Sequence, residues 1–299
     1  MPPEPSLRKG VFVMLLSVVM FTSNSLIIRW AGLFADVNGW LASFTRGVAG
    51  TIFVLALYSR GRGLELKRVT QPLIILRGIL GVTGITILYF TIIHLGAGRA
   101  LLLNLSYPIF GVIFASLLLG ERLTLRISGY LTIATIGLAI FFWPSLKNAT
   151  FSSYDLLGIL GAIVAGTTVV LIRQLTKTET APTIYTGQCF ITLLITAPFA
   201  APSFTNYSLA VWGLLLLGGF IVAYGQILLT KGFFHLDVAR GSALQMLIPP
   251  LTGLGSLLFF EERFQALELF GGTLIIFATW RITQPNSSKR EANSKQKGP

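Results

Sequence analysis

The chain has 299 residues, of which 53% are hydrophobic and only 11% are charged, and its formal net charge is +12. Soluble domains carry about 25% charged residues, so this composition excludes a water-soluble fold and indicates that the bilayer is the solvent. The positive charge would suit nucleic acid, but the basic residues are dispersed between apolar segments. That distribution favours loops beside anionic lipid headgroups. The single cysteine, Cys189, excludes an intramolecular disulfide.

Ten apolar segments follow one another along the chain, each close to the length that a membrane-spanning helix needs. The first follows Arg8 and Lys9 and resembles a signal peptide. It is longer than the apolar core of a signal and lacks a clear small-residue cleavage site, so we expect a retained span. The expected spans are about 10–28, 38–58, 72–93, 97–119, 124–143, 156–175, 182–200, 208–230, 239–260 and 264–282. The expected fold is therefore an all-α integral membrane protein with ten transmembrane helices.

One stretch of sequence occurs twice without a gap. Residues 94–122 correspond to residues 235–263, and each copy contains a short polar turn, about twenty mostly apolar residues broken by a proline, and an acid-arginine pair. The matched residues are His94 and His235, Arg99 and Arg240, Leu103 and Leu244, Pro108 and Pro249, and Glu121-Arg122 and Glu262-Arg263. A constant offset near half of the chain length is typical of an internal repeat.

The repeat divides the chain into two halves. We expect five-helix repeats over residues 1–146 and 147–283, and a disordered basic tail over residues 284–299. Because each half has an odd number of spans, the second half enters the membrane from the opposite side, and the repeats are inverted. Basic residues are concentrated on the side of the termini, which predicts cytoplasmic termini, with His94 outside and His235 inside. Inverted repeats are typical of secondary transporters.

The chain resembles the EamA type of the drug/metabolite transporter superfamily over nearly its whole length. The resemblance is carried by Phe44-Thr45-Arg46, Leu76-Arg77-Gly78, the run from Asn104 to Pro108 with Leu119-Gly120-Glu121-Arg122, and Pro249-Pro250 with Phe260-Glu261-Glu262-Arg263. It implies a bacterial inner-membrane carrier of small organic solutes, often amino acids and related metabolites. In aromatic amino-acid exporters of the superfamily a tryptophan precedes the fourth-span proline. Here Tyr107 stands in that place, which argues against an aromatic substrate.

Polar side chains inside apolar spans are costly unless they face protein or water, so they are the candidates for substrate binding. Arg46 and Arg77 are embedded arginines. Either both extend toward the headgroups or bond backbone carbonyls of neighbouring helices, or one of them lines a cavity and receives a carboxylate or phosphate. Weaker candidates, for which packing is the alternative role, are Asn24, Thr83, Thr168 and Gln188.

The proline of each copy is expected to break its span. Asn104 and Gln245 lie four residues before Pro108 and Pro249, where a proline removes the intrahelical hydrogen bond to the carbonyl. One interpretation is a kink with interhelical bonding, and the other is a midplane site where bent helices expose amides and carbonyls. We count Asn104, Tyr107 and Gln245 as substrate-binding candidates, and Pro108, Pro249 and Pro250 as helix breaks involved in gating.

No acidic residue lies in the middle of an expected span, which favours facilitated diffusion or exchange over ion coupling. We expect a secondary transporter of small amino-acid-like, zwitterionic or anionic metabolites that works by alternating access, as an exporter or exchanger. No cofactor, metal site or catalytic residue is expected. The alternatives are an uptake carrier for a nucleoside-like or cofactor-like solute and a membrane-embedded lipid-modifying enzyme, for which the sequence shows no catalytic constellation. Expected partners are the solute, membrane lipids and at most a second copy of the chain.

Overall fold

The computed structural model describes residues 5–60, 63–147, 150–261 and 264–284. These residues form twelve α-helices and three short 3-10 helices, with no strand in the described ranges. The α-helices are α1 (Leu7–Gly32), α2 (Gly39–Tyr58), α3 (Pro72–Leu95), α4 (Ala97–Asn104), α5 (Tyr107–Leu119), α6 (Leu125–Phe141), α7 (Ser153–Leu175), α8 (Ala181–Ala200), α9 (Leu209–His235), α10 (Val238–Gln245), α11 (Ile248–Phe260) and α12 (Ala266–Thr283). Glu262, Arg263 and the expected tail beyond Gln284 lie outside the described residues.

The prediction of an all-α membrane protein is confirmed. Nine helical segments of the described chain are long and apolar enough to cross a bilayer. Two of these segments are helices joined end to end, α4 with α5 and α10 with α11. The remaining expected span is α6, whose 17 residues fall just short of the roughly 20 that a span needs. Large apolar side chains such as Leu117, Leu194 and Leu258 are exposed, as expected of side chains that face lipid.

Polar caps and glycines set the ends of the helices. The side chain of Asn38 accepts a hydrogen bond from the backbone N–H of Trp40 at the start of α2. Ser152 and Asp155 form a capping box at the start of α7. Such caps satisfy backbone N–H groups that have no partner within the helix. Gly120 has a φ of 66° just after α5, a left-handed conformation that glycine adopts without strain.

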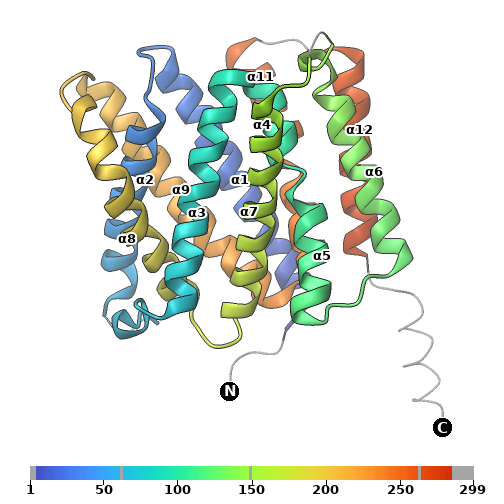
Figure 1. Cartoon of the computed structure of the whole chain (residues 1–299), viewed down its shortest axis with the longest axis horizontal. Coiled ribbons are helices and arrows are strands. Elements are labelled where there is room, and N and C mark those ends of the chain that lie inside the picture. Colours follow the sequence, from blue (N-terminus) through green and yellow to red (C-terminus); the bar gives the residue numbers. More distant parts are fainter. Residues whose placement is uncertain (1–4, 61–62, 148–149, 262–263, 285–299) are drawn as a thin grey trace.

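The helices cross the bundle in alternating directions, and α1 begins at the same face where α12 ends (Figure 1). We call this the terminal face, and the opposite one the distal face. The α1 helix runs from the terminal to the distal face, whereas α7 runs from the distal to the terminal face. Corresponding helices of the two halves therefore run in opposite directions, as inverted repeats require. The exact boundaries of the two halves stay a prediction.

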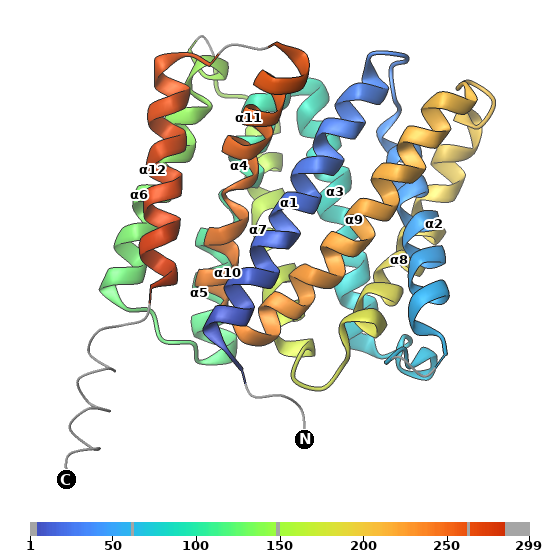
Figure 2. The ribbon, with the colours of Figure 1, turned by 180° about the vertical axis from the view of Figure 1, so that it is seen from behind.

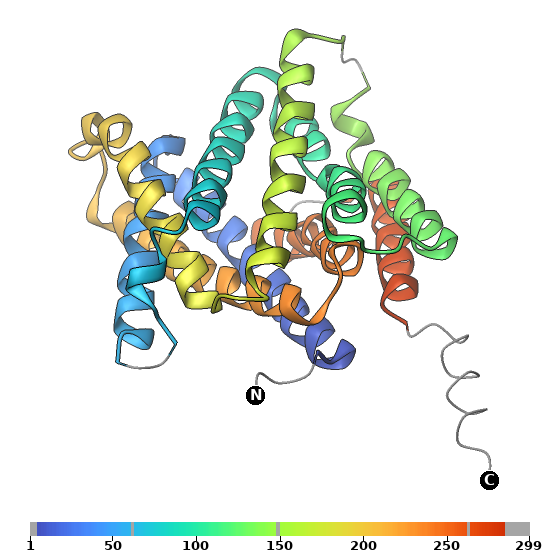
Figure 3. The ribbon, with the colours of Figure 1, turned by 60° about the horizontal axis from the view of Figure 1, so that its bottom comes forward.

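The halves are interleaved and do not stand side by side as separate lobes. The α1 helix packs along α9 (Figure 2), and α3 packs along α7. The α2–α8 pair and the α6–α12 pair lie at opposite edges of the bundle (Figure 3). In the α6–α12 pair the backbones approach closely, because a Cβ atom on Gly137 would lie only 2.9 Å from the carbonyl oxygen of Gly271. Each of these pairs takes one helix from each half, so the interior is lined by both halves.

Each half contains one broken span. The first break lies between Asn104 and Tyr107, and the second lies between Gln245 and Ile248. Pro108 and Pro249 are the second residues of α5 and α11, where a missing N–H costs nothing because that group has no helical partner. The two breaks are alike, but the short helices before them differ in burial. Seven of the eight residues of α10 are buried, whereas only Ala100 is buried in α4.

Candidate functional site

A cavity of about 190 Å³ lies between the spans formed by α2, α3, α4–α5, α7, α8 and α9. We call it the central cavity. No residue of the first, fifth, ninth or tenth span is among its described lining residues. Six of the nine candidate binding residues line it, namely Arg46, Arg77, Asn104, Tyr107, Thr168 and Gln188. Residues scattered over more than 140 positions of the sequence are thus brought together.

Arg77 is the most deeply placed charge of the central cavity. It lies in the second turn of α3, its residue surface is only 2% exposed, and its Nε and Nη1 atoms have no hydrogen-bond partner. Gly81, one turn later, leaves space for it, since a Cβ atom there would lie 2.9 Å from Nη1. Among the described residues that line the cavity there is no acidic side chain. A buried charge without a counter-charge costs several kcal/mol, so the cavity is suited to an anionic group.

Two glutamines that line the same cavity have side-chain acceptors without hydrogen-bond partners. Gln188 of α8 and Gln226 of α9 both line it, and the Oε1 atom of each is buried without a partner. The Nε2 atom of Gln188 would lie 3.3 Å from a Cβ atom built on Gly81, so its amide and the Arg77 guanidinium both lie beside this glycine. An unsatisfied buried polar atom costs about 1–3 kcal/mol. The cavity therefore offers both cationic donors and neutral acceptors to a solute.

Gln226 was missed by the sequence analysis, although the signal was present. It is an embedded amide near the end of an apolar span, as Gln188 is near the start of one. The same rule that selected Gln188 would have selected it.

Three candidate residues lie away from the central cavity in this conformation. The Oδ1 atom of Asn24 lies 2.9 Å from a Cβ atom built on Gly218, at the α1–α9 contact. Thr83 is exposed. Gln245 is 3% exposed, and its Nε2 atom lies 3.0 Å from the sulfur of Met14. Their role in binding stays a prediction.

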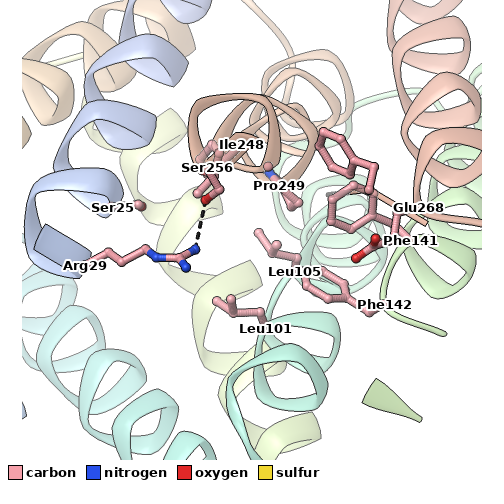
Figure 4. Close-up of a pocket in the computed structure, with 13 residues that line it drawn as sticks. Ser25, Arg29, Leu101, Leu105, Phe141, Phe142, Ile248, Pro249, Ser256 and Glu268 are labelled. Atoms are coloured by element: carbon pink, nitrogen blue, oxygen red, sulfur yellow. Dashed lines mark hydrogen bonds between the residues drawn. The ribbon is translucent and has the colours of Figure 1, made fainter. Parts of the chain in front are cut away.

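A second, larger cavity of about 310 Å³ lies in the distal half of the bundle (Figure 4). We call it the outer cavity. Arg29 enters it from α1, donates a hydrogen bond of 3.0 Å to the Oγ atom of Ser256, and lies 4.5 Å from the ring centre of Phe260. On the opposite wall stand Glu268 and the ring of Phe142. The sequence analysis did not select Arg29 or Glu268, because charged residues at span ends need no special explanation.

The short helix α4 separates the two cavities. Leu101 and Leu105 line the outer cavity, while Asn104 and Tyr107 line the central cavity. The break after Asn104 thus lies at the boundary between the two spaces. Pro249, at the matching break of the second half, lines the outer cavity, and Pro250 beside it is buried.

At the terminal face, one ion pair holds the corner between α9 and α10. The Nε atom of Arg173 lies 3.0 Å from a carboxylate oxygen of Glu121, and its Nη1 atom donates hydrogen bonds to the carbonyls of Phe233 and Phe234. The other carboxylate oxygen of Glu121 accepts the N–H of Val238 at 2.8 Å. Four elements, α5, α7, α9 and α10, are thereby tied together. Glu121 therefore binds across the bundle and does not act only at the end of its own helix.

The distal face carries different contacts. Arg99 of α4 pairs with Asp155 of α7 at 2.7 Å, and the ring of His94 stacks on Tyr154 with centroids 3.8 Å apart. His94 lies in the last turn of α3 at the distal face, and His235 ends α9 at the terminal face, so the two histidines do not form one site. Within the described ranges, no group of three or more histidine, cysteine, aspartate or glutamate residues could hold a metal ion.

Comparison with known proteins places these features in a family context. The model of the EamA-like transporter family matches residues 8–143 and again residues 152–284. The pseudopaline exporter of Pseudomonas aeruginosa is 28% identical over 91% of this chain and 95% of its own length. A probable terminal-alkyne amino-acid exporter of Streptantibioticus cattleyicolor is 27% identical over 96% of this chain and 98% of its own. A solved crystal structure has the same fold, with a TM-score of 0.76, 16% identity and coverage of 92% of this chain and 96% of that one.

Proposed function

Since the chain belongs to the EamA-like transporter family and is an integral membrane transporter, we propose that it carries a small organic metabolite with an acidic group through the central cavity. The observation that carries this proposal is the placement of Arg46 and Arg77 in one cavity between six spans, with no acidic side chain among the described residues around it. A guanidinium binds a carboxylate or a phosphate through strong charge-assisted hydrogen bonds. The cavity volume of about 190 Å³ is below the roughly 300 Å³ of pockets for drug-sized ligands, which favours a metabolite over a drug.

We propose alternating access as the mechanism. At the terminal face Glu121 and Arg173 bond to the α9–α10 corner, whereas the distal half holds the outer cavity, and we infer from this that the conformation is closed toward the terminal face. The difference in burial between α10 and α4 agrees with a conformation that is closed on one side only. In a transporter built from inverted repeats, the opposite state results when the two halves exchange conformations.

We place the terminal face in the cytoplasm. The basic residues at the ends of the spans are concentrated there, and cytoplasmic loops of membrane proteins carry an excess of lysine and arginine. The described basic residues on this side are Arg8, Lys9, Arg60, Lys67, Arg68, Arg122, Arg126, Arg173, Lys177, Lys231, Arg240 and Arg281, against Arg29, Arg99 and Lys147 on the distal side. The proposed location is a bacterial inner membrane.

We propose export or exchange as the direction. Two full-length relatives carry names of exporters of amino-acid-like compounds or of pseudopaline, and both match over more than nine-tenths of this chain. No acid of the sequence lies mid-span, which favours movement down a solute gradient over coupling to protons or sodium.

Membrane vesicles test the proposal. Inside-out vesicles that contain the chain should accumulate a labelled acidic metabolite from a panel, and vesicles without the chain should not. Vesicle orientation is checked with an impermeant thiol reagent on a His94→Cys, Cys189→Ser variant, which should be labelled from outside the cell only. The proposal fails if only neutral or cationic solutes move, or if none moves. Faster initial uptake by right-side-out vesicles than by inside-out vesicles, under the same solute gradient, would instead identify an uptake carrier.

A further inference from the structure

We infer that the solute of the central cavity is an amino-dicarboxylic or hydroxy-dicarboxylic acid, bound by Arg46 and Arg77 through its two acidic groups and by Gln188 and Gln226 through its N–H or O–H group. This inference rests on the proposed function, because it names the substrate class of the same cavity. It is carried by the charge balance of the cavity and by its buried polar atoms without partners.

The charge balance requires two acidic groups. Arg46 and Arg77 line one cavity, and no described acidic side chain lines it with them. A solute with a single carboxylate leaves one of the two guanidinium groups without a counter-charge, and a neutral zwitterion leaves the net charge of the site unchanged. Because an unpaired charge away from water is costly, a solute with two carboxylates fits this site better than a monocarboxylate.

The polar atoms without partners require a donor on the same solute. Arg77 has two nitrogen atoms, Nε and Nη1, without acceptors, and Gln188 and Gln226 each have an Oε1 atom without a donor. Carboxylates satisfy the arginine but offer nothing to the glutamine oxygens, because an ionised carboxylate only accepts hydrogen bonds. An ammonium or hydroxyl group beside the carboxylates supplies the missing donor. Nη1 of Arg77 and Nε2 of Gln188 both lie beside Gly81, so both can donate to one carboxylate there, and the Oε1 atoms of the two glutamines remain for the donor group.

The four residues come from both halves of the transporter, so a bound solute contacts both halves. Arg46 and Arg77 come from α2 and α3 in the first half, and Gln188 and Gln226 come from α8 and α9 in the second half. By repeat position, α2 corresponds to α8 and α3 corresponds to α9. The first half thus contributes the two cations, and the second half contributes two neutral amides from the corresponding helices. The acidic groups and the donor group are therefore bound by different halves of the transporter.

The test measures binding to the purified full-length chain in lipid nanodiscs, at constant ionic strength, by the shift in unfolding temperature and by competition between solutes. The probes are L-aspartate and L-malate, which have both features, L-asparagine, which lacks the second acid, and succinate, which lacks the donor group. We expect L-aspartate and L-malate to bind at least about tenfold more tightly than L-asparagine or succinate. A charge-assisted or donor–acceptor hydrogen bond of this kind accounts for about that factor.

Variants assign the two features to the residues. Arg46→Gln and Arg77→Gln should weaken L-aspartate binding to the level of L-asparagine. Arg77→Lys should retain part of the preference for L-aspartate over L-asparagine, and it shows whether the protein still folds with a changed residue at this buried position. Gln188→Leu or Gln226→Leu should weaken L-aspartate binding toward the level of succinate. Arg126→Gln is the matched control, because Arg126 lies at the terminal end of α6, outside both cavities, and it should leave all four affinities unchanged.

The outcomes separate this inference from the proposed function. If the wild-type chain binds L-asparagine or succinate as tightly as L-aspartate, or binds none of the four probes, the substrate class is wrong. Transport of any other acidic metabolite by vesicles that contain the chain would then leave the proposed function standing. If Arg46→Gln and Arg77→Gln weaken the binding of all four probes equally, the two arginines do not distinguish solutes with two carboxylates from solutes with one. The inference is then overturned.

Discussion

The shape of the central cavity depends on a glycine, which has no side chain, at position 81. A Cβ atom on Gly81 would lie 2.9 Å from Nη1 of Arg77 and 3.3 Å from Nε2 of Gln188, so Gly81→Ala should displace both groups from the site. The loss of one charge-assisted hydrogen bond, about 1.5–3 kcal/mol, predicts that the affinity for the acidic solute falls by about tenfold or more. Binding to the purified variant in nanodiscs measures this effect.

Gly84 supplies the matched control for that change. It lies on the same helix and lines the same cavity, but a Cβ atom there would make only an ordinary contact, 3.6 Å from Val164. Both glycine-to-alanine changes increase intrinsic helix stability by about 1 kcal/mol, so that effect cancels in the comparison. Gly84→Ala should bind the solute with nearly unchanged affinity. An equal loss in the two variants would show that α3 packing, and not the position of Arg77, controls binding.

The sequence alone identifies much of the central cavity, because polar side chains are rare in apolar spans and each one needs a reason. That rule selected Arg46, Arg77 and Gln188, and applied strictly it would have selected Gln226 as well. It could not tell that Thr83 is exposed, since a threonine hydroxyl can satisfy itself on its own helix and then face in any direction. Which face of a helix points inward is decided by its neighbours, and a single sequence does not contain them.

At the scale of helices, the two breaks could be placed from the sequence, but their unequal burial could not. Proline cannot continue the hydrogen bonding of a preceding helix, so Pro108 and Pro249 mark the breaks directly. The sequence of the two copies is similar, and yet α10 is almost fully buried, whereas six of the eight residues of α4 are only half-buried. That difference belongs to the conformation of the whole bundle, because nothing in either copy alone specifies it.

The ion pair at the terminal face is expected to stabilise the closed state of that face. Glu121 and Arg173 are about one-fifth exposed and bond to backbone groups of α9 and α10. Glu121→Gln removes the charge and should weaken closure by about 1–2 kcal/mol, which raises the open population roughly fivefold to thirtyfold. The rate at which an Ala239→Cys reporter beside Glu121 reacts with a maleimide, in a Cys189→Ser background, should rise by that factor.

Glu65→Gln is the control for this prediction. Glu65 pairs with Arg68 at 2.7 Å, also at the terminal face, but both side chains are about half exposed and only three residues apart. Exposed pairs of this kind contribute little, about 0–1 kcal/mol, so the reporter should react at the wild-type rate. An equal increase in both variants would show that net charge, and not the bond to the α9–α10 corner, affects the reporter.

At the scale of the whole molecule, α4 and α10 differ in burial, and alternating access should reverse this difference. Leu101 and Ser242 occupy matched positions of the two copies. Leu101 lines the outer cavity, whereas Ser242 is 0% exposed. The Ser242 hydroxyl would be exposed to water if α10 becomes uncovered in the opposite state. Gln245, now packed on Met14, would be uncovered with it.

We therefore predict that the accessibilities of these two positions exchange during transport. In a Cys189→Ser background, Leu101→Cys should react with an impermeant maleimide from the distal side, and Ser242→Cys should be protected. A conformation open to the terminal side, favoured by adding Glu121→Gln, should slow the reaction of Leu101→Cys and allow Ser242→Cys to react from the terminal side only. Because the populations of the two states sum to one, the two rates should change in opposite directions, by a large factor for Ser242→Cys and by a smaller one for Leu101→Cys. If both cysteines became more reactive at once, Glu121→Gln would be loosening the bundle as a whole, and the exchange between inverted halves would be the wrong mechanism.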